Sequence, residues 1–239
     1  MTGEAFQDLK SQVAIVTGGS KGIGKAIGRA LARRGAFVVL AARTSRDLEA
    51  TVAEFKEEGL GVAGRKTDIA SEEDVKALIS ETIRERGRID ILVNNAGMGV
   101  FKPVVEMEVA EFDRMWQVNM RGVFLATKAV LPHMIKADAG NIVNIASLAG
   151  KNSFKGGAGY CATKWGLRGF AGSLMLEVRD HNIRVVTICP GSVDTAFSAT
   201  GKRGKQITQA EDVADAVVFA VTAPARSMFS EIDVRPTRP

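Results

Sequence analysis

One segment near the start limits the folds open to this chain more than any other, a glycine-rich turn between an apolar run and a helical pattern. Residues 13–17 (VAIVT) are apolar or β-branched, which predicts a buried parallel strand. The turn GGSKGIG follows at 18–24, and apolar residues then recur at helical spacing at 26, 27, 30 and 31. Such a turn binds anions, because the free N–H groups and the dipole of the helix point at it. The segment therefore predicts a phosphate site on an α/β sheet.

Strand-like and helix-like segments alternate along the rest of the chain. Further strands are expected at residues 36–42, 61–66, 89–93, 141–146, 183–188 and 230–234. The helices expected between them cover residues 45–58, 71–86, 109–135, 159–180 and 211–221. Residues 192–209 lack a core pattern and indicate a flap or a short helix. The alternation predicts one α/β domain over residues 1–239, a doubly wound parallel sheet with helices on both faces.

Composition narrows the functional classes. No apolar run approaches the roughly 18 residues of a membrane span, and the start MTGEAFQDLKSQ does not resemble a signal peptide. Two cysteines form no disulfide framework, so a cytoplasmic location is expected. The net charge of +5 is dispersed among acidic residues, which argues against a nucleic-acid partner. The two histidines have no ligand-spaced neighbours, which argues against a metal site.

The end of the expected strand at 36–42 bears on which dinucleotide such a fold prefers. Folds selective for NAD usually place Asp or Glu there, where it accepts a hydrogen bond from the ribose 2′-hydroxyl. This chain has Ala41, Ala42, Arg43 and Thr44 instead. Arg43 and Lys21 are suited to pair with a 2′-phosphate that a carboxylate would repel, which favours NADP. The alternative is that Arg43 is only a solvated residue at a strand end.

The stretch from 147 to 164 (SLAGKNSFKGGAGYCATK) contains the groups best suited to proton chemistry. Tyr160 and Lys164 are four residues apart, so a helix from Gly159 onward places them on one face. An ammonium lowers the pKa of a neighbouring phenol from about 10, and such a phenol exchanges protons with a carbonyl or alcohol oxygen. Ser147 is a candidate donor to the same oxygen. Alone, the Tyr–Lys pair also fits an ordinary surface helix.

Residues of interest follow several of the expected strands. Gly18, Asn95, Ser147 and Pro190 each lie just beyond a strand. Ligands of open α/β sheets bind outside the carboxyl ends of the strands. We therefore expect these positions to meet in one site.

These motifs, in this order and spacing, resemble the short-chain dehydrogenase/reductases from end to end. TGxxxGxG at 17–24 is similar to the cofactor turn of that family, and NNAG at 94–97 to its central-strand motif. The positions of its catalytic tetrad are matched by Asn119, Ser147, Tyr160 and Lys164. The resemblance implies a Rossmann-like sheet of about seven strands and a homotetramer or homodimer assembled through two long helices.

The resemblance also implies a role for each residue. Tyr160 would be the general acid of carbonyl reduction, Lys164 would lower its pKa and bind the nicotinamide ribose, and Ser147 would hold the substrate oxygen. Asn119 would hold a water in a proton relay to Lys164. The implied cofactor is NADP(H). The residues expected to bind it are Gly18, Ser20, Lys21, Gly22, Ile23, Gly24, Arg43, Thr44, Asp68, Ile69, Asn95, Ala96, Gly97, Tyr160, Lys164, Pro190, Gly191, Val193 and Thr195.

The motifs imply an oxidoreductase without naming its substrate. The expected activity is NADP(H)-dependent hydride transfer between the nicotinamide and a ketone, an aldehyde or a secondary alcohol. The overall resemblance is to the 3-oxoacyl-[acyl-carrier-protein] reductase type, but the basic segment AFSATGKRGKQ and the end EIDVRPT depart from it. Two alternatives stay open, an NAD-dependent polyol or hydroxysteroid dehydrogenase and a catalytically silent NADP(H)-binding sensor or scaffold. Tyr160 and Lys164, which a silent protein would be expected to lose, are both present.

Overall fold

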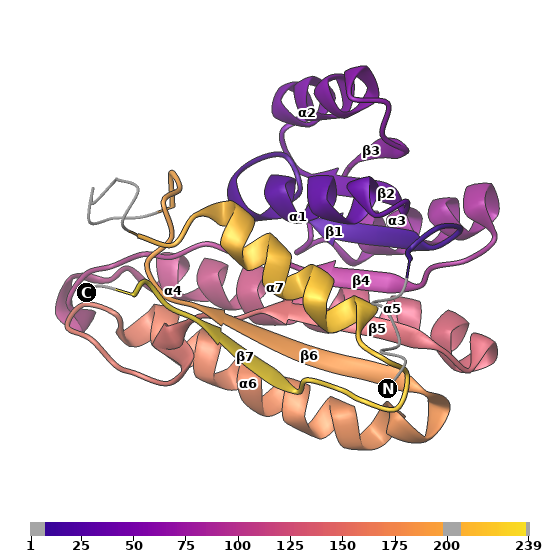
Figure 1. The fold of residues 1–239 in the computed structure, drawn as a ribbon. Helices are drawn as coiled ribbons and strands as arrows, with labels where there is room; N and C mark the ends of the chain where they lie inside the picture. The colour runs from indigo at the N-terminus through magenta and orange to yellow at the C-terminus, as the bar shows by residue number, and fades with distance from the viewer. Residues whose placement is uncertain (1–7, 198–206, 238–239) are drawn as a thin grey trace.

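The computed structural model describes residues 8–197 and 207–237, and its described strands form one parallel sheet of seven (Figure 1). The strand order is β3-β2-β1-β4-β5-β6-β7. The strands are β1 (Val13–Thr17), β2 (Phe37–Ala42), β3 (Val62–Lys66), β4 (Ile91–Asn94), β5 (Gly140–Ile145), β6 (Ile183–Pro190) and β7 (Glu231–Val234). The predicted Rossmann-like sheet is confirmed.

Helices cover both faces of this sheet (Figure 1). They are α1 (Gly22–Arg33), α2 (Ser45–Glu57), α3 (Glu72–Arg86), α4 (Val109–Trp116), α5 (Gly122–Ala137), α6 (Ala158–Val178) and α7 (Ala210–Thr222). One apolar core lies under α1, α2 and α7 and includes Ile27, Phe55 and Val217. The other lies under α3, α5 and α6 and includes Leu78, Val130 and Leu174. The sheet is therefore doubly wound, as predicted.

The central strands are buried on both faces, which explains why most of their residues are apolar. Every residue of β1, β4 and β5 is buried. Strand β1 pairs with β2 on one side and with β4 on the other. The chain therefore turns in opposite directions after β1 and after β4, and this reversal opens a crevice at the carboxyl edge of the sheet.

The predicted helix over residues 109–135 differs from the observed one at its middle. A π-helical turn, Gln117–Arg121, separates α4 from α5. A π turn admits one extra residue into a helix without ending it, and no local sequence signal marks it. Asn119 lies in this turn and is buried, so the inserted residue changes which side chains face the crevice.

The segment after β6 is described only in part. Val193 and Thr208 form an isolated parallel bridge, and α7 begins soon afterwards at Ala210. The expected flap or short helix falls largely on residues 198–206, which lie outside the described residues. Among the described helices, none combines the length and the apolar character that a membrane crossing requires.

Candidate active site

A cleft of about 1040 Å³ lies at the carboxyl edge of the sheet, where the crevice was expected. All of the residues predicted to bind the cofactor line it, together with Ser147. Asn119 is not among the lining residues and lies behind the wall of the cleft. The cleft is further lined by residues outside the predicted set, among them Asp47, Thr67, Phe101 and Phe197.

The turn after β1 forms one end of the cleft and leads into the N-terminus of α1. No side chain caps this terminus, and its first turn contains no acidic residue. Its free N–H groups and positive dipole end are therefore available to an anion. Gly22 has a φ of +53°, a left-handed conformation that glycine adopts without strain. A methyl group on Gly24 would overlap the carbonyl oxygen of Gly18 and the side chain of Asn95.

Asn95 holds this turn in place through its side chain. Its amide nitrogen donates to the carbonyl oxygens of Thr17, at 2.9 Å, and Gly18, at 3.2 Å. The Thr17 hydroxyl in turn accepts from the backbone nitrogens of Asn95 and Ala96, each at 3.0 Å. The turn after β1 and the turn after β4 are thus linked across the crevice. The Asn95 side chain, predicted to bind the cofactor, is already engaged in supporting the loop that lines the cleft.

The same end of the cleft carries exposed basic groups. Lys21 and Arg43 make no ion pair within residues 8–197 and 207–237, and no carboxylate occurs between Ala41 and Thr44. Asp68 lies nearby and is held by Arg114, at 3.0 Å. Burial acts to raise the pKa of Asp68, but hydrogen bonds from the Ala70 backbone and from Arg114 outweigh it and leave the pKa lowered. This end therefore combines two exposed cations with an acid that already has a partner.

Tyr160, Lys164 and Ser147 meet at the other end of the cleft. Tyr160 and Lys164 are in the first two turns of α6, and both are buried. The Lys164 Nζ donates to the carbonyl oxygen of Ile145, at 2.8 Å, and lies 5.7 Å from the centre of the Tyr160 ring. The Ser147 hydroxyl accepts from the backbone nitrogen of Ala149, at 3.1 Å. Strand β5 delivers the serine and α6 delivers the other two groups to one point.

The pKa of Tyr160 differs from the sequence expectation in the protein without ligands. Burial raises the pKa of Tyr160 to about 12, against a smaller opposite effect of its hydrogen bond with Ser147. Burial also lowers the pKa of Lys164 to about 8. The sequence predicted that the Lys164 ammonium lowers the pKa of the Tyr160 phenol. Burial has the larger effect, because removal from water disfavours the charged form of each group.

Asn119 is 1% exposed, and its side chain has partners on two segments. Its amide nitrogen donates to the carbonyl oxygen of Met98, at 2.8 Å, and to the Thr163 hydroxyl, at 3.0 Å. Its amide oxygen accepts from the Met98 backbone nitrogen, at 2.9 Å. Thr163 donates in turn to the carbonyl oxygen of Tyr160, at 2.8 Å. The π-helical turn thereby joins the loop after β4 to the turn of α6 that contains Tyr160.

The geometry can be compared with known proteins. The sequence profile described as short chain dehydrogenase matches residues 12–206. The chain belongs to this family. An uncharacterised oxidoreductase of Staphylococcus aureus strain MRSA252 is 34% identical over 229 residues, which cover 95% of this chain and 98% of that protein.

Solved structures agree with this assignment. A metagenomic short-chain oxidoreductase in complex with NADP is 40% identical, with a TM-score of 0.86 over 97% of this chain and 100% of that one. An alcohol dehydrogenase of the archaeon Thermococcus sibiricus, complexed with 5-hydroxy-NADP, is 32% identical, with a TM-score of 0.88 over 95% and 98%. The resemblance to carrier-protein reductases stays a prediction.

Three phenylalanine rings form a connected group beside the tyrosine of this short-chain dehydrogenase, and two of them contact it. Phe101 lies edge-on to Tyr160, with ring centres 5.3 Å apart, and Phe197 lies 5.9 Å from Tyr160. Phe154 contacts Phe101 at 5.9 Å. Neither Phe101 nor Phe197 was singled out from the sequence. The position of Phe101, four residues after the NNAG motif, was the available signal for a second ring.

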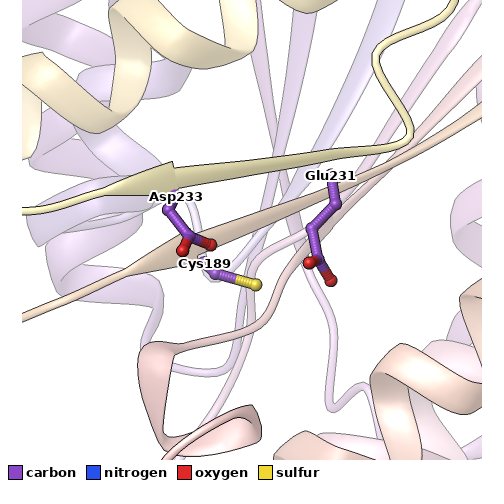
Figure 2. Close-up of side chains that lie close together, drawn as sticks. All are labelled: Cys189, Glu231 and Asp233. Carbon is purple, nitrogen blue, oxygen red and sulfur yellow. The ribbon is translucent and has the colours of Figure 1, made fainter.

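A second side-chain cluster of the short-chain dehydrogenase lies at the edge strand (Figure 2). Cys189 on β6 faces Glu231 and Asp233 on β7, with ligand-type atoms within 4.8 Å of one another. Lys151 pairs with both carboxylates, and Arg168 binds Glu231 at 2.7 Å. Burial raises the pKa of Cys189 to about 11, so the thiol stays protonated. Arg235 also pairs with Asp233, at 3.1 Å, so three cations already neutralise the two carboxylates. The ion pairs of Lys151 and Arg168 tie β7 to the loop after β5 and to α6.

Proposed function

We propose that this chain is an NADP(H)-dependent oxidoreductase that interconverts a ketone or aldehyde and the corresponding secondary or primary alcohol. The proposal rests above all on the buried Tyr160, which lies beside Ser147 and Lys164 at one end of the cleft. A phenol on a cleft wall, with a hydroxyl and an ammonium near it, is equipped to exchange a proton with a carbonyl or alcohol oxygen. The family assignment supports oxidoreductase chemistry at that position.

The residues of the cleft fit an NADP(H) molecule. The uncapped N-terminus of α1 suits the pyrophosphate, because its N–H groups have no side-chain acceptor. Lys21 and Arg43 suit a 2′-phosphate, because both are exposed cations without an ion pair in the described part of the chain. Two similar structures hold NADP or its 5-hydroxy derivative, which supports the same choice. Such a cofactor supplies the hydride and the electrons of the reaction.

The chain itself supplies position and proton transfer. Ser147 would donate a hydrogen bond to the carbonyl oxygen and so fix the substrate against the phenol. Tyr160 would give its proton to that oxygen as the alcohol forms, and take one back in the reverse reaction. Lys164 would stabilise the phenolate left behind, since its ammonium and the tyrosine share one face of α6. Asn119 would position a water near Lys164 through which the proton is restored.

The titration of Tyr160 favours reduction at neutral pH. With a pKa of about 12, the phenol is fully protonated at pH 7 and ready to act as an acid. Oxidation of an alcohol needs the phenolate, whose population rises with pH. The positive charge of an oxidised nicotinamide lowers the pKa of a nearby phenol by the same rule that acts for an ammonium. We therefore expect alcohol oxidation to accelerate with pH while carbonyl reduction does not.

Two alternative functions remain, and the oligomeric state and the location are also proposals. An NAD-dependent dehydrogenase requires Arg43 to be incidental, and a silent dinucleotide sensor requires Tyr160 to have no role in turnover. A homodimer or homotetramer would bury the exposed aromatic side chains of α4, α5 and α6, which are 40–48% exposed and comprise Phe112, Trp116, Phe124 and Trp165. We also propose that the protein is cytoplasmic.

The deciding experiment follows the oxidation of NADPH, with NADH in parallel, on a panel of carbonyl compounds. The panel holds an acetoacetyl thioester, a diketone, an aromatic aldehyde and a steroid ketone. Turnover with NADPH supports the proposal, and faster turnover with NADH would favour the first alternative. Binding of NADPH without turnover of any compound would favour the silent sensor.

A further inference from the structure

We propose that the substrate is a ketone or aldehyde whose carbonyl group is attached to an aromatic ring, and that Phe101, Phe154 and Phe197 select it. This inference rests on the proposed function, since it concerns the same cleft. The three rings, here called the aromatic wall, come from three separate segments, the loops after β4, β5 and β6. All three line the cleft at the end that holds Tyr160.

Phe101 is the centre of the aromatic wall. It contacts Phe154 at 5.9 Å, Tyr160 at 5.3 Å and Phe197 at 6.2 Å between ring centres. Its plane makes 75° with Tyr160 and 87° with Phe197, so both pairs are edge-to-face. Edge-to-face contacts align the positive edge of one ring with the negative face of the next. An aromatic ring of the substrate could add one more edge-to-face contact to this arrangement. An aliphatic chain cannot make such a contact.

The two outer rings have free apolar surface. Phe154 is 47% exposed and Phe197 46% exposed, although both belong to a cleft and not to a convex surface. Exposed apolar surface in a concave site is favourable to cover, and the group that covers it here lies next to the phenol of Tyr160. A substrate with its carbonyl at the phenol and a ring against Phe154 and Phe197 satisfies both conditions.

Glycines make room for the aromatic wall. A methyl group on Gly99 would lie 2.6 Å from the Phe101 ring and 3.1 Å from the Phe197 ring. A methyl group on Gly157 would lie 2.6 Å from the Phe154 ring. Neither glycine has a positive φ, so the backbone does not require glycine at these positions. The missing side chains instead leave the space next to the main chain that the tips of the rings occupy.

The charges around the cleft fit a substrate without a positive charge. Its described acidic lining residues are Asp47 and Asp68, and both follow β2 or β3 at the opposite end. The basic lining residue Lys155 directly follows Phe154, and Lys102, which directly follows Phe101, is paired with Glu111. The neutral polar residues Asn152, Ser153 and Thr195 also line the cleft beside Phe154 and Phe197 in sequence, and the carbonyl oxygen would lie at Ser147 and Tyr160. A neutral aryl ketone or aryl aldehyde matches this distribution, whereas an amine does not.

The test compares a phenyl methyl ketone with cyclohexyl methyl ketone, which has a ring of similar volume but no π system. For the wild-type protein with NADPH, kcat/KM for the phenyl ketone should exceed that for the cyclohexyl ketone by about tenfold. The variants Phe154→Leu and Phe197→Leu keep apolar volume, and each should reduce this ratio about three- to tenfold. Phe229→Leu is the matched control, because Phe229 is a partly exposed ring paired with Phe219 away from the cleft. It should leave the ratio unchanged.

A binding measurement separates the failure of this inference from the failure of the proposed function. The affinities for phenyl methyl ketone and cyclohexyl methyl ketone are measured by calorimetry in the presence of NADP⁺, a pair that cannot react because both partners are oxidised. A preference for the phenyl ketone that Phe154→Leu and Phe197→Leu weaken would support the aromatic wall even in a protein that turns over neither ketone. Equal affinities and equal kcat/KM for the two rings would overturn it while leaving the oxidoreductase proposal intact. A wild-type preference that survives in both variants would overturn the role of the aromatic wall.

Discussion

The two ends of the cleft differ in the groups that form them, which are mainly backbone at one end and side chains at the other. The end near α1 consists of backbone, with a glycine turn, free N–H groups and two exposed cations beyond it. The end near α6 consists of side chains, with Tyr160, Lys164 and Ser147 together and the connected rings of Phe101, Phe154 and Phe197 beside Tyr160. Backbone geometry tolerates few residue types, whereas an apolar wall tolerates many. The comparison teaches that the first end is built for one type of ligand, whereas side-chain changes at the second end can alter which substrate fits.

The variant with the largest expected effect is Tyr160→Phe, which should abolish the chemistry at the second end and leave cofactor binding at the first end unchanged. The ring contacts with Phe101 and Phe197 remain, but the transferable proton is lost, so kcat should fall at least about 1000-fold. NADPH affinity and the melting temperature should change little, because the glycine turn is untouched. Titration calorimetry with NADPH, run beside turnover assays, checks both expectations. Turnover close to wild type would refute the role of the phenol.

The variant Gly24→Ala should lose NADPH affinity, whereas Tyr160→Phe should lose turnover and keep NADPH affinity. The added methyl group overlaps the Gly18 carbonyl oxygen and the Asn95 side chain, so the turn must shift and NADPH affinity should fall about 100-fold or more. Gly172→Ala is the matched control, since it is also inside a helix and its methyl group would meet nothing within 4 Å. The control should keep wild-type affinity. Equal affinities in the two variants would show that the turn does not hold the cofactor.

Cofactor choice at the first end should depend on Arg43. The variant Arg43→Asp replaces a cation by a carboxylate that repels a 2′-phosphate and accepts from a 2′-hydroxyl. The ratio of kcat/KM for NADPH to that for NADH should fall about 10- to 100-fold. Arg46→Asp, a change of the same charge two residues inside α2, serves as the control. An unaltered ratio in Arg43→Asp would contradict the NADP assignment.

The single tyrosine of the chain allows the second end to be titrated directly. With the pKa of Tyr160 raised to about 12, the ultraviolet signal of phenolate should be nearly absent at pH 10, where a free tyrosine is half ionised. Saturating NADP⁺ should move the titration to lower pH. The Tyr160→Phe protein provides the blank. A phenolate signal already at half height near pH 10 would contradict the effect of burial.

A smaller effect on stability is expected from Lys164→Met. The pKa of Lys164 is lowered to about 8 from 10.5, so the buried ammonium destabilises the fold at pH 7 by on the order of 1–3 kcal/mol. The variant should therefore melt at a higher temperature at pH 7 although it is inactive. Between pH 8 and 10.5 the unfolded wild-type chain binds more protons than the folded one, so wild-type stability rises with pH. The advantage of the variant should disappear across that interval.

The sequence predicted the first end of the cleft more fully than the second. The central strands were located mainly from their apolar residues, because strands buried on both faces are rich in such residues, whereas β3 (VAGRK) and β7 (EIDV) gave a weaker signal. The glycine turn at 18–24 was recognisable for a related reason, since close backbone approach leaves no room for side chains. These features are local in the sequence, and local features can be recognised without coordinates.

The features that were missed depend on contacts between distant segments. The aromatic wall needs Phe101, Phe154 and Phe197 to be brought together by three loops, and no spacing reveals that. The raised pKa of Tyr160 depends on how deeply α6 buries it. The π-helical turn was also missed, because its extra residue is favoured by the bonds that Asn119 makes to Met98 and Thr163 and not by local propensity.

The position of β1 in the sheet affects how the chain folds while it is being synthesised. Strands β1, β2 and β3 are made first and can pair as a unit, but β1 gains its second neighbour only when β4 has been synthesised. Until then a wholly apolar strand keeps one edge open, and open edges of this kind pair readily with other chains. The nascent protein is therefore most prone to aggregation during synthesis of α3, well before Tyr160 exists. A cofactor cannot protect the chain during this interval, because one end of its cleft has not yet been made.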